Sequence, residues 1–578
     1  MAQNVAEQLV DMLAEAGIQR IYAVTGDSLN EINDAVRRDG RIKWVHVRHE
    51  EAGAFAAAAE AELNGLACCA GSSGPGHVHL INGLYDANKT GAPVLAIAST
   101  CLSTEFGTDF FQETNTSKLF DDCSVYNQLA TTPAQLPRML QTAIQHAVHK
   151  KGVAVLAIPG DLTKLKAEAS PSATSLFKVA PVIRPSDPEL RAIAELLNAH
   201  EKICLFCGIG AAEAHDEVIQ LAALLQAPVA YSFRGKMSIQ YDNPFEVGMT
   251  GLLGLPSAFH AMHEADVIVL LGTDFPYVPF LPTDKKIIQV DLRPEKLGRR
   301  AALTIGVCGE VAHTLQALCP HLLTKKDDRF LRAQLAFYEE VQKKLLTYVE
   351  DPGTHDKIHP EFVAYTLDKL AADDAIFTVD TGMCCVWGAR YLRATGHRKL
   401  IGSFNHGSMA NAMPHAIGAA FAQPGKQIVA LCGDGGISML LGDLATIVQY
   451  KLPIKIIVFN NRSLGMVKLE MEVAGLPDNE TDLYNPDFAL VATAMGMSSL
   501  SVHAHEEVEQ ALSSAFSQQG PVLVNIFTDP NALAMPPKVE WEMMQGFGVT
   551  MGKLMLNGRM QEVWDTVKSN YKHLKEVI

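Results

Sequence analysis

Two short polar motifs in the last third of the chain have the residue types and spacing of a magnesium site. Gly433-Asp434-Gly435 places a carboxylate on a glycine turn, and Asn460-Asn461 closes the apolar run 454–459 that follows. Together with the backbone carbonyl of Ser463, these groups offer the hard oxygen ligands that Mg²⁺ prefers. Because phosphates often complete the coordination of Mg²⁺, the motifs predict a bound diphosphate.

A Gly-Asp-Gly turn alone also fits a β-turn with a capping aspartate. The Asn pair favours the ligand site, because two amides at the end of a buried strand need polar partners.

Composition excludes several classes of partner. The 578-residue chain has a formal net charge of −16 and a pI near 5.7, which argues against nucleic acid and favours a small ligand. Eleven scattered cysteines do not form a disulfide framework in so long a chain, which favours a cytosolic location. The pair Cys204 and Cys207 lies in an apolar run and is interpreted as part of a buried strand.

The chain is expected to be soluble or peripheral to a membrane. Val5, Leu9, Met12 and Leu13 share one face of an amphipathic helix closed by Gly17, with acidic residues that a signal peptide would exclude. No run approaches the ~20 apolar residues needed to cross a bilayer.

Short apolar runs alternate with helical segments, which predicts α/β domains with doubly wound parallel sheets. Two breaks in this pattern, at 170–185 and 325–360, divide the chain into thirds. We therefore expect three domains, at 1–182, 183–335 and 336–535, followed by a C-terminal tail at 536–578. Strands are expected at 21–24, 44–47, 66–70, 94–98, 153–158, 203–206, 267–271, 287–290, 375–379, 428–431 and 454–459.

Several longer motifs carry a resemblance to a known family. They are the segments 24–29 (VTGDSL), 48–51 (RHEE), 74–76 (GPG), 111–114 (FQET), 248–251 (GMTG) and 403–414 (SFNHGSMANAMP). With the magnesium motif, they make essentially the whole chain similar to the bacterial pyruvate oxidases that reduce quinone, flavoproteins of the thiamine diphosphate superfamily. The resemblance implies three cofactors, namely thiamine diphosphate, Mg²⁺ and FAD, and a homo-oligomer, with a tetramer expected and a dimer as the minimum.

The resemblance assigns roles around thiamine diphosphate. Glu50 would hydrogen-bond the aminopyrimidine, although first-turn acids such as Glu50 and Glu51 also favour the helix dipole. Met409 would bend the cofactor and the carbonyl of Gly407 would face its 4′-amino group. Asp434, Asn461 and Ser463 would hold Mg²⁺, and the remaining contacts would come from Ser408, Gly435, Gly436, Arg462, Leu464, Gly465 and Met466. In the family, the glutamate and the metal motif come from different subunits.

The middle third is interpreted as an FAD domain. Gly208-Ile209-Gly210 follows a strand, but Glu213 stands at the third glycine of a dinucleotide fingerprint, which argues against NAD. The resemblance implies FAD contacts from Gly208, Arg234, Thr250, Gly251, Leu252, Leu253, Asp274, Phe275, Pro276, Tyr277, Val278 and Asp291. For Asp291, an acid in a turn at a strand end is the alternative.

The activity implied is oxidative decarboxylation of pyruvate to acetate and CO₂, with electrons passing from the thiamine-bound enamine to FAD and then to ubiquinone. Phe111 and Gln112, with Phe404 nearby, are candidates for the pyruvate pocket. Met466 departs from the Phe expected in these oxidases and is typical of acetohydroxyacid synthases, whereas Glu470 replaces their tryptophan. A carboligase with non-redox FAD, a phosphate- or oxygen-using pyruvate oxidase and a non-catalytic assembly protein are the alternatives. The retention of Glu50, Asp434 and Asn461 argues against the last.

The tail suggests contact with the inner face of the cell membrane. Val563, Trp564, Val567, Tyr571, Leu574 and Ile578 form an apolar stripe, with lysines on other faces. The family's C-terminal segment binds phospholipid, so a peripheral membrane anchor is predicted. A terminal helix docked on its own domain or on a neighbouring subunit is the alternative.

Overall fold

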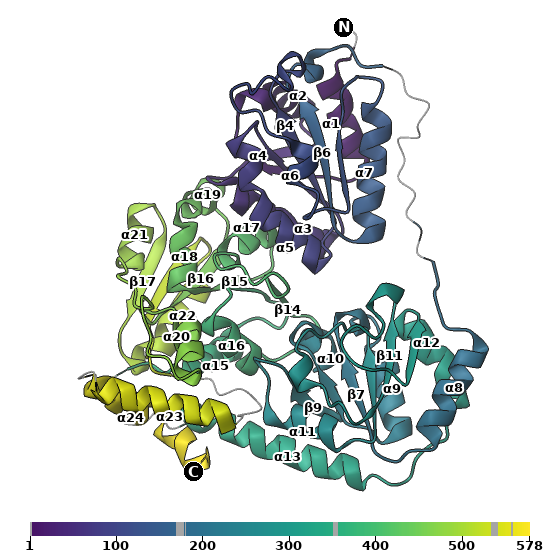
Figure 1. Cartoon of the computed structure of the whole chain (residues 1–578). Helices are drawn as coiled ribbons and strands as arrows, with labels where there is room; N and C mark the ends of the chain where they lie inside the picture. Colours follow the sequence, from purple (N-terminus) through teal and green to yellow (C-terminus); the bar gives the residue numbers. More distant parts are fainter. Residues whose placement is uncertain are drawn as a thin grey trace.

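Three parallel sheets organise the chain, one in each third. The structure is a computed structural model and describes residues 3–168, 179, 181–350, 357–532, 541–556 and 559–577. Each sheet has six strands, and every recorded pairing between named strands is parallel. Figure 1 shows the three domains arranged around a common centre, with helices packed against both faces of the sheets. The predicted α/β class and parallel sheets are thus confirmed.

The N-terminal domain has the strand order β2-β1-β3-β4-β6-β5. Its first helix begins at the capping box of Asn4 with Glu7, and buries the predicted face of Val5, Leu9 and Leu13. Its elements are α1 Val5–Glu15, β1 Arg20–Ala23, α2 Asn30–Asp39, β2 Lys43–His46, α3 Glu50–Asn64, β3 Ala67–Gly71, α4 Pro75–His79, α5 Ile81–Thr90, β4 Val94–Thr100, α6 Thr116–Leu119, β5 Tyr126–Leu129, α7 Leu136–Lys150 and β6 Val153–Pro159.

The central domain has the strand order β12-β11-β10-β7-β8-β9. This is the order of dinucleotide-binding folds, whose ligands bind where the sequence of strands reverses, here between β7 and β10. Its elements are α8 Asp187–Asn198, β7 Ile203–Cys207, α9 His215–Leu225, β8 Val229–Tyr231, α10 Lys236–Ile239, β9 Glu246–Met249, α11 Pro256–Glu264, β10 Val267–Leu271, β11 Lys286–Asp291, β12 Ile305–Cys308, α12 Val311–Leu318 and α13 Arg329–Leu345. Cys204 and Cys207 lie fully buried in β7, as predicted.

The C-terminal domain repeats the strand pattern of the first, in the order β14-β13-β15-β16-β18-β17. Its elements are α14 Thr347–Glu350, α15 Pro360–Leu370, β13 Ile376–Val379, α16 Met383–Tyr391, β14 Lys399–Gly402, α17 Ala412–Ala422, β15 Ile428–Gly433, α18 Asp434–Met439, α19 Leu444–Tyr450, β16 Ile454–Asn460, α20 Gly465–Val473, α21 Phe488–Ala494, β17 Ser498–Val502, α22 Val508–Ser517 and β18 Val522–Phe527. Two helices follow, α23 Trp541–Leu556 and α24 Met560–Val577.

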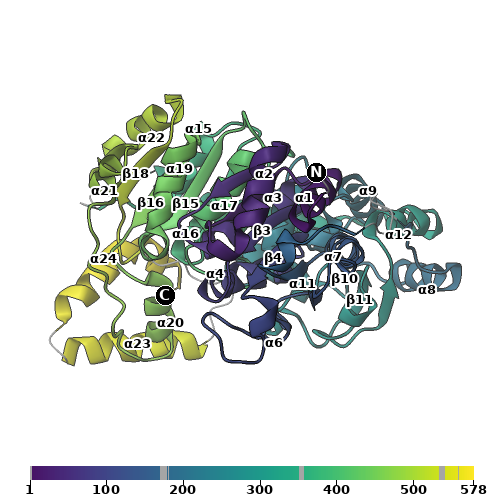
Figure 2. The ribbon, with the colours of Figure 1, turned by 90° about the horizontal axis from the view of Figure 1, so that it is seen from above.

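The first and last domains share one hydrophobic core through α3 and α17, which lie side by side in Figure 2. Small side chains allow the two backbones to touch, because α3 is rich in alanine and α17 carries Gly418 at the contact. A Cβ at Gly418 would overlap the carbonyl oxygen of Ala56. Close backbone approach therefore fixes how these two domains sit together.

Part of the stretch at 325–360, expected to be a linker, is helical. Helix α13 buries Leu331 and Val341, and it crosses the boundary predicted at 335/336. Its Tyr338 hydroxyl donates to Glu246 in the central domain, so α13 belongs to that domain by its packing.

Candidate active site

A cavity of about 280 Å³ lies at the carboxyl ends of β13, β15 and β16 in the C-terminal domain. Predicted cofactor residues that line it are Gly407, Met409, Asp434, Gly435, Gly436, Asn461, Ser463, Leu464, Gly465 and Met466. Ser408 and Arg462 do not line it, although both lie next to residues that do. Parallel strands open their carboxyl ends at one edge of the sheet, which explains why motifs distant in sequence meet here.

Asp434 begins α18 and is almost fully buried. Its Oδ1 accepts from the amide of Gly435 at 2.9 Å, and its Oδ2 accepts from the amide of Arg462 at 2.6 Å and from Asn485 Nδ2 at 2.8 Å. Burial raises the pKa of Asp434, and the hydrogen bond from Asn485 partly offsets that effect. The carboxylate is therefore held in one orientation by several donors.

Asn485 was not singled out from the sequence. Its Nδ2 also lies 3.0 Å from Oδ1 of Asn460, so it joins the two motifs that carried the magnesium prediction. Asn461 Oδ1 accepts from the amide of Ser463 at 3.0 Å, which holds the turn after β16. The buried Ser463 hydroxyl has no hydrogen-bond partner in the described residues.

The cavity fits a magnesium diphosphate. A carboxylate, a carboxamide oxygen and a backbone carbonyl form a hard donor set for Mg²⁺. Glycines keep the walls free of side chains, because a Cβ at Gly436 would overlap Asp380 Oδ2, and one at Gly435 would press on Met409 and Leu464 at 3.1 Å.

Glu50, Phe111 and Gln112 lie together on the N-terminal domain. Glu50 is the first residue of α3, is 8% exposed and lies 3.0 Å from His79 Nδ1 through Oε2. Gln112 has a left-handed backbone, with φ of 63°, and accepts from Ser73 Oγ at 3.0 Å. Phe111 is 77% exposed. None of these residues lines the cavity, whose lining comes from residues 360–566.

The two domains nevertheless touch beside the cavity. Asn82 Nδ2 donates to Glu51 Oε1 at 2.7 Å and to Ser408 Oγ at 2.8 Å, and Asn82 Oδ1 lies 2.9 Å from His406 Nε2. Ser408 in turn donates to the carbonyl of Met409. Glu51, rather than Glu50, is thus connected to the loop that carries Met409.

Most of the predicted FAD residues gather at the point where the central strand order reverses. A Cβ at Gly208 would lie 2.5 Å from the carbonyl oxygen of Gly272, and Gly235, which follows Arg234, faces Gly208 in the same way. Arg234 itself donates to the carbonyl oxygen of Thr90 in the N-terminal domain at 3.0 Å. Glycine at these positions lets the loops after β7, β8 and β10 pack closely at the switch point, where dinucleotide-binding folds hold their ligands.

The loops after β9 and β10 meet at the same place. Gly251 has a φ of 109°, and a Cβ there would lie 3.0 Å from Phe275 and 3.5 Å from Tyr277. The hydroxyl of Thr250 is buried with no hydrogen-bond partner in the described residues, which suits a polar ligand. Leu252, Tyr277 and Val278 expose their side chains, whereas Leu253 is half-buried, and Pro276 lies within this turn.

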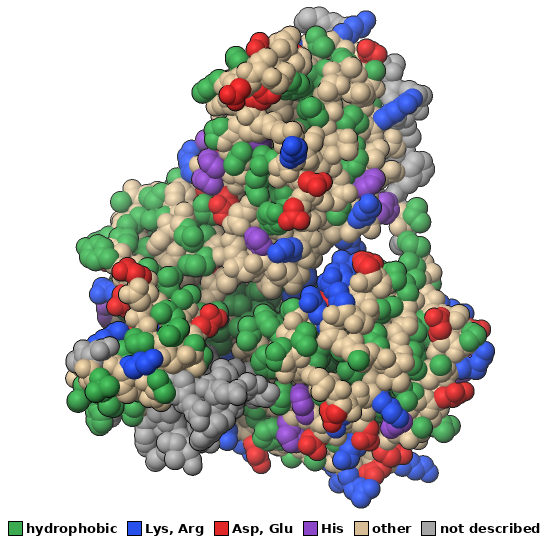
Figure 3. All heavy atoms as spheres, in the orientation of Figure 1, with side chains coloured by type: hydrophobic (Ala, Val, Ile, Leu, Met, Phe, Trp, Pro, Cys, Tyr) green, Lys and Arg blue, Asp and Glu red, His purple; other side chains and the backbone are tan. Residues whose placement is uncertain are grey.

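Acidic residues at this edge have different surroundings. Burial alone would raise the pKa of Asp274, but the hydrogen bond from Arg299 and the nearby Lys296 and Arg300 outweigh it and lower that pKa. Figure 3 shows basic side chains gathered where the central domain faces the N-terminal domain. Asp291 is 7% exposed, and burial raises its pKa. The positions of the predicted FAD residues are compatible with a bound FAD. Asp274 already forms ion pairs with Lys296, Arg299 and Arg300.

Comparisons with known proteins agree with this arrangement. Three models of thiamine pyrophosphate enzymes match, the N-terminal binding domain at 3–119, the central domain at 190–318 and the C-terminal binding domain at 380–526. A putative thiamine pyrophosphate-containing protein of Bacillus subtilis is 35% identical, covering 99% of this chain and 100% of its own. Pyruvate oxidase of Lactiplantibacillus plantarum is 32% identical over 89% and 87%, and acetolactate synthase 1 of Zea mays is 28% identical over 92% and 86%.

The chain belongs to the family of thiamine pyrophosphate enzymes. It is thus a thiamine diphosphate-dependent enzyme, of the group that includes pyruvate oxidases and acetolactate synthases, whose chemistry is decarboxylation and carboligation of 2-oxo acids. Mg²⁺ is typical of this family, and FAD is compatible with the central domain.

Proposed function

We propose that the protein decarboxylates pyruvate oxidatively to acetate and CO₂, passing the electrons to FAD and then to ubiquinone at the membrane. The main support is a contact between the two predicted cofactor regions. Arg390 of α16, in the thiamine domain, donates through Nε to the carbonyl oxygen of Leu253 and through Nη2 to that of Gly254, both at 3.2 Å. The loop assigned to FAD therefore rests directly on the domain that contains the thiamine cavity.

Side chains between the two regions add to this support. Phe233, beside the predicted FAD residue Arg234, packs edge-on against Phe404 with ring centroids 4.5 Å apart. Phe233, Leu253, Phe404 and Met466 all pack against the core of the C-terminal domain. Electrons that leave the cavity would thus cross a mostly apolar region to reach a flavin held by the central domain.

The cavity of the C-terminal domain would hold Mg²⁺ and the diphosphate of the cofactor. The ligands would be Asp434, Asn461 and the carbonyl of Ser463. Thiamine diphosphate, when bound, supplies an electron sink for the loss of CO₂ from a 2-oxo acid. Met409 and Leu464 flank Gly435 in the cavity and would press on the organic part of the cofactor. Glu50 would hold a proton on the aminopyrimidine.

A second copy of the chain would complete the site. Glu50, Phe111 and Gln112 lie outside the cavity of their own chain, and Phe111 is highly exposed. We propose that these residues face the cavity of a partner subunit, in a homo-oligomer of at least two and, from the resemblance, four chains. Phe111 and Gln112 would then form part of the pyruvate pocket.

The tail supports the membrane step. Helix α24 docks through Val563, Thr566 and Asn570, and Ser569 Oγ donates to Asp529 at 2.9 Å. Its other face exposes Met560, Trp564 and Val567 at i, i+4 and i+7, and α23 exposes Val549, Met555 and Leu556. This apolar stripe would rest on the inner face of the cell membrane.

The side chains of Tyr571 and Leu574, and all of Ile578, lie outside the described residues. No helix in the described part of the chain is long and apolar enough to span a bilayer.

The test is the visible absorbance of the purified protein, held anaerobic with thiamine diphosphate, Mg²⁺ and FAD, before and after addition of pyruvate. Stoichiometric bleaching of the flavin with formation of acetate is the expected result. The second candidate is a carboligase, which Met466 in the cavity wall favours, although Glu470 there does not. Accumulation of acetolactate with an unbleached flavin would replace the oxidase by the carboligase.

A further inference from the structure

A loop of the N-terminal domain, residues 107–114, carries the two residues proposed for the pyruvate pocket, Phe111 and Gln112. Its residues up to Phe111 are exposed, so burial contributes little to its conformation. Asp109 and Gln112 nevertheless have left-handed backbones, with φ of 60° and 63°. A residue other than glycine takes this conformation at a cost in free energy, which contacts elsewhere must offset. The contacts of the loop 107–114 therefore decide where Phe111 and Gln112 lie.

One set of contacts closes the loop 107–114 on itself. The carboxylate of Glu113 accepts from the backbone amide of Gly107 at 2.6 Å and from that of Phe110 at 3.1 Å. These hydrogen bonds, the one from Gly107 first, lower the pKa of Glu113, so the group stays ionised near neutral pH. They give the loop its shape, but they do not attach it to the rest of the domain.

Two side-chain hydrogen bonds join the loop to the start of α4 and the turn before it. Ser73 Oγ donates to Gln112 Oε1 at 3.0 Å, and Thr114 Oγ1 lies 2.6 Å from His77 Nε2. Gly74 lies between these two contacts in sequence and has a φ of 65°. A Cβ at Gly74 would lie 2.8 Å from the Cβ of Gln112. The loop thus rests directly on this turn, and a shift of Thr114 would also move Gln112, two positions away.

His77 holds its end of this contact in one orientation. It is fully buried, and its Nδ1 lies 2.8 Å from the carbonyl oxygen of Ser99 in β4. A carbonyl oxygen only accepts, so Nδ1 carries the proton. Burial lowers the pKa of His77 and keeps the ring neutral, so Nε2 accepts from the hydroxyl of Thr114. The ring also packs edge-on against Phe120, with centroids 5.9 Å apart.

We propose that His77 is a positioning residue for the pyruvate pocket, because the hydrogen bond that it accepts from Thr114 holds Phe111 and Gln112 in place. This inference rests on the proposed function, in which both residues face the cavity of a partner subunit. His77 is fully buried, so it would not itself contact pyruvate. Loss of the hydrogen bond should raise KM for pyruvate, and leave the maximal rate and the affinity for thiamine diphosphate unchanged.

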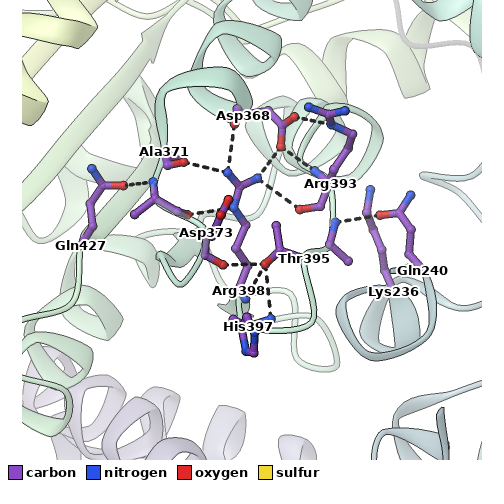
Figure 4. A network of polar contacts seen from close by, with 12 residues as sticks. Lys236, Gln240, Asp368, Ala371, Asp373, Arg393, Thr395, His397, Arg398 and Gln427 are labelled. Carbon is purple, nitrogen blue, oxygen red and sulfur yellow. Dashed lines mark hydrogen bonds and ion pairs between the residues drawn. The ribbon is translucent and has the colours of Figure 1, made fainter. Parts of the chain in front are cut away.

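Thr114→Val tests the hydrogen bond, because it removes the hydroxyl, keeps the size of the side chain and does not alter α4. KM for pyruvate, measured by anaerobic flavin reduction in the full-length enzyme holding its cofactors, should rise about three- to tenfold. Thr114→Ser keeps the hydroxyl and should have a KM near that of wild type. Thr395→Val is the matched control. The hydroxyl of Thr395 also donates at 2.6 Å, to the carbonyl oxygen of Asp373, but it lies beside Arg398 in the C-terminal domain (Figure 4).

His77→Asn tests the acceptor. The amide of asparagine can replace Nδ1 as a donor to Ser99, but the side chain is too short to reach Thr114. KM should therefore rise as in Thr114→Val. The double variant should match either single variant, because both substitutions remove the same hydrogen bond. If His77→Asn unfolds, Thr114→Val decides.

Amide hydrogen exchange separates this inference from the proposed function. In Thr114→Val, exchange across residues 107–114 should be severalfold faster than in wild type and in Thr395→Val. An unchanged KM for pyruvate in Thr114→Val would overturn the proposal. If pyruvate does not reduce the flavin of wild type, the proposed function fails, and unchanged exchange in Thr114→Val would then overturn the positioning role of His77 as well.

Discussion

The side-chain amide of Asn485 lies 2.8 Å from Oδ2 of Asp434 and fixes the carboxylate at the floor of the thiamine cavity. Because the same amide nitrogen reaches Asn460, one residue connects both halves of the predicted magnesium motif. Mutation of a group that orients a metal ligand typically lowers metal affinity by about 10–100-fold.

Replacing Asn485 by alanine should therefore weaken magnesium-dependent binding of thiamine diphosphate by about tenfold or more. Calorimetric titration of the cofactor at saturating Mg²⁺ measures this affinity. Asn243→Ala is the control, since its amide donates to Ile239 in the central domain, far along the chain from the site. Unchanged affinity in Asn485→Ala would show that Asp434 needs no such support.

The contact of α3 with α17 gives a prediction about stability. In Gly418→Ala the added methyl group overlaps the carbonyl oxygen of Ala56, and overpacking of this kind costs about 1–3 kcal/mol. We expect a lower melting temperature than in Gly520→Ala, where the new methyl group meets nothing within 4 Å. Equal melting temperatures would mean that the two helices can separate without loss of stability.

Substitution of Met466 tests whether the loop that carries it is that of an oxidase. It lines the cavity at the second residue of α20. Met466→Phe should retain or raise the rate at which pyruvate reduces the flavin, measured by anaerobic stopped-flow absorbance. Met439→Phe, on an exposed side chain outside the cavity, is the control. Complete loss of flavin reduction in Met466→Phe alone would refute this interpretation.

The exposed stripe of α24 predicts how lipid binding depends on sequence. Trp564 is 64% exposed, so Trp564→Ser should reduce flotation with liposomes severalfold without disturbing the docked face. Deletion of 560–578 should abolish flotation, but it also removes Thr566 from the cavity wall, so Trp564→Ser is the variant expected to leave flavin reduction intact. Leu490→Ser removes an equally exposed apolar side chain from α21 and should have no effect. Equal flotation of wild type and the deletion variant would exclude α24 as the anchor.

Lys455 gives stability a defined pH dependence. Burial lowers the pKa of its ammonium group from 10.5 to about 8, so between these values the unfolded chain binds more protons than the folded one. Stability should consequently rise with pH across that range because of this group. Chemical denaturation at several pH values should show a shallower rise in Lys455→Met than in wild type. Parallel curves would assign the titration to other groups.

The sequence predicted the three sheets because their central strands are continuous apolar runs. Some missed strands are short or polar, as in Ser498–Val502, where serines alternate with apolar residues at a sheet edge. The apolar strand Val522–Phe527, which lies inside the sheet, was also missed. Val229–Tyr231 has three residues, too few for any period to emerge.

In the candidate site, glycine turns and strand-end amides were visible in sequence, whereas Asn485 was not. It stands in an irregular segment 25 positions from Asn460, and only the folded chain brings the two together. The position of Glu50 outside its own cavity also had no signal in local sequence, because it depends on how whole domains pack. The resemblance to a known family, and not residue spacing, supplied that expectation.

The contact between α3 and α17 also sets an order of events during synthesis. About 350 residues separate these helices, so α3 leaves the ribosome long before its partner exists. At a synthesis rate of about 5–20 residues per second, α17 is made on the order of half a minute after α3. Until then the side of α3 that later packs against α17 lacks the cover of the C-terminal domain, so we expect the nascent chain to bind chaperones during that interval.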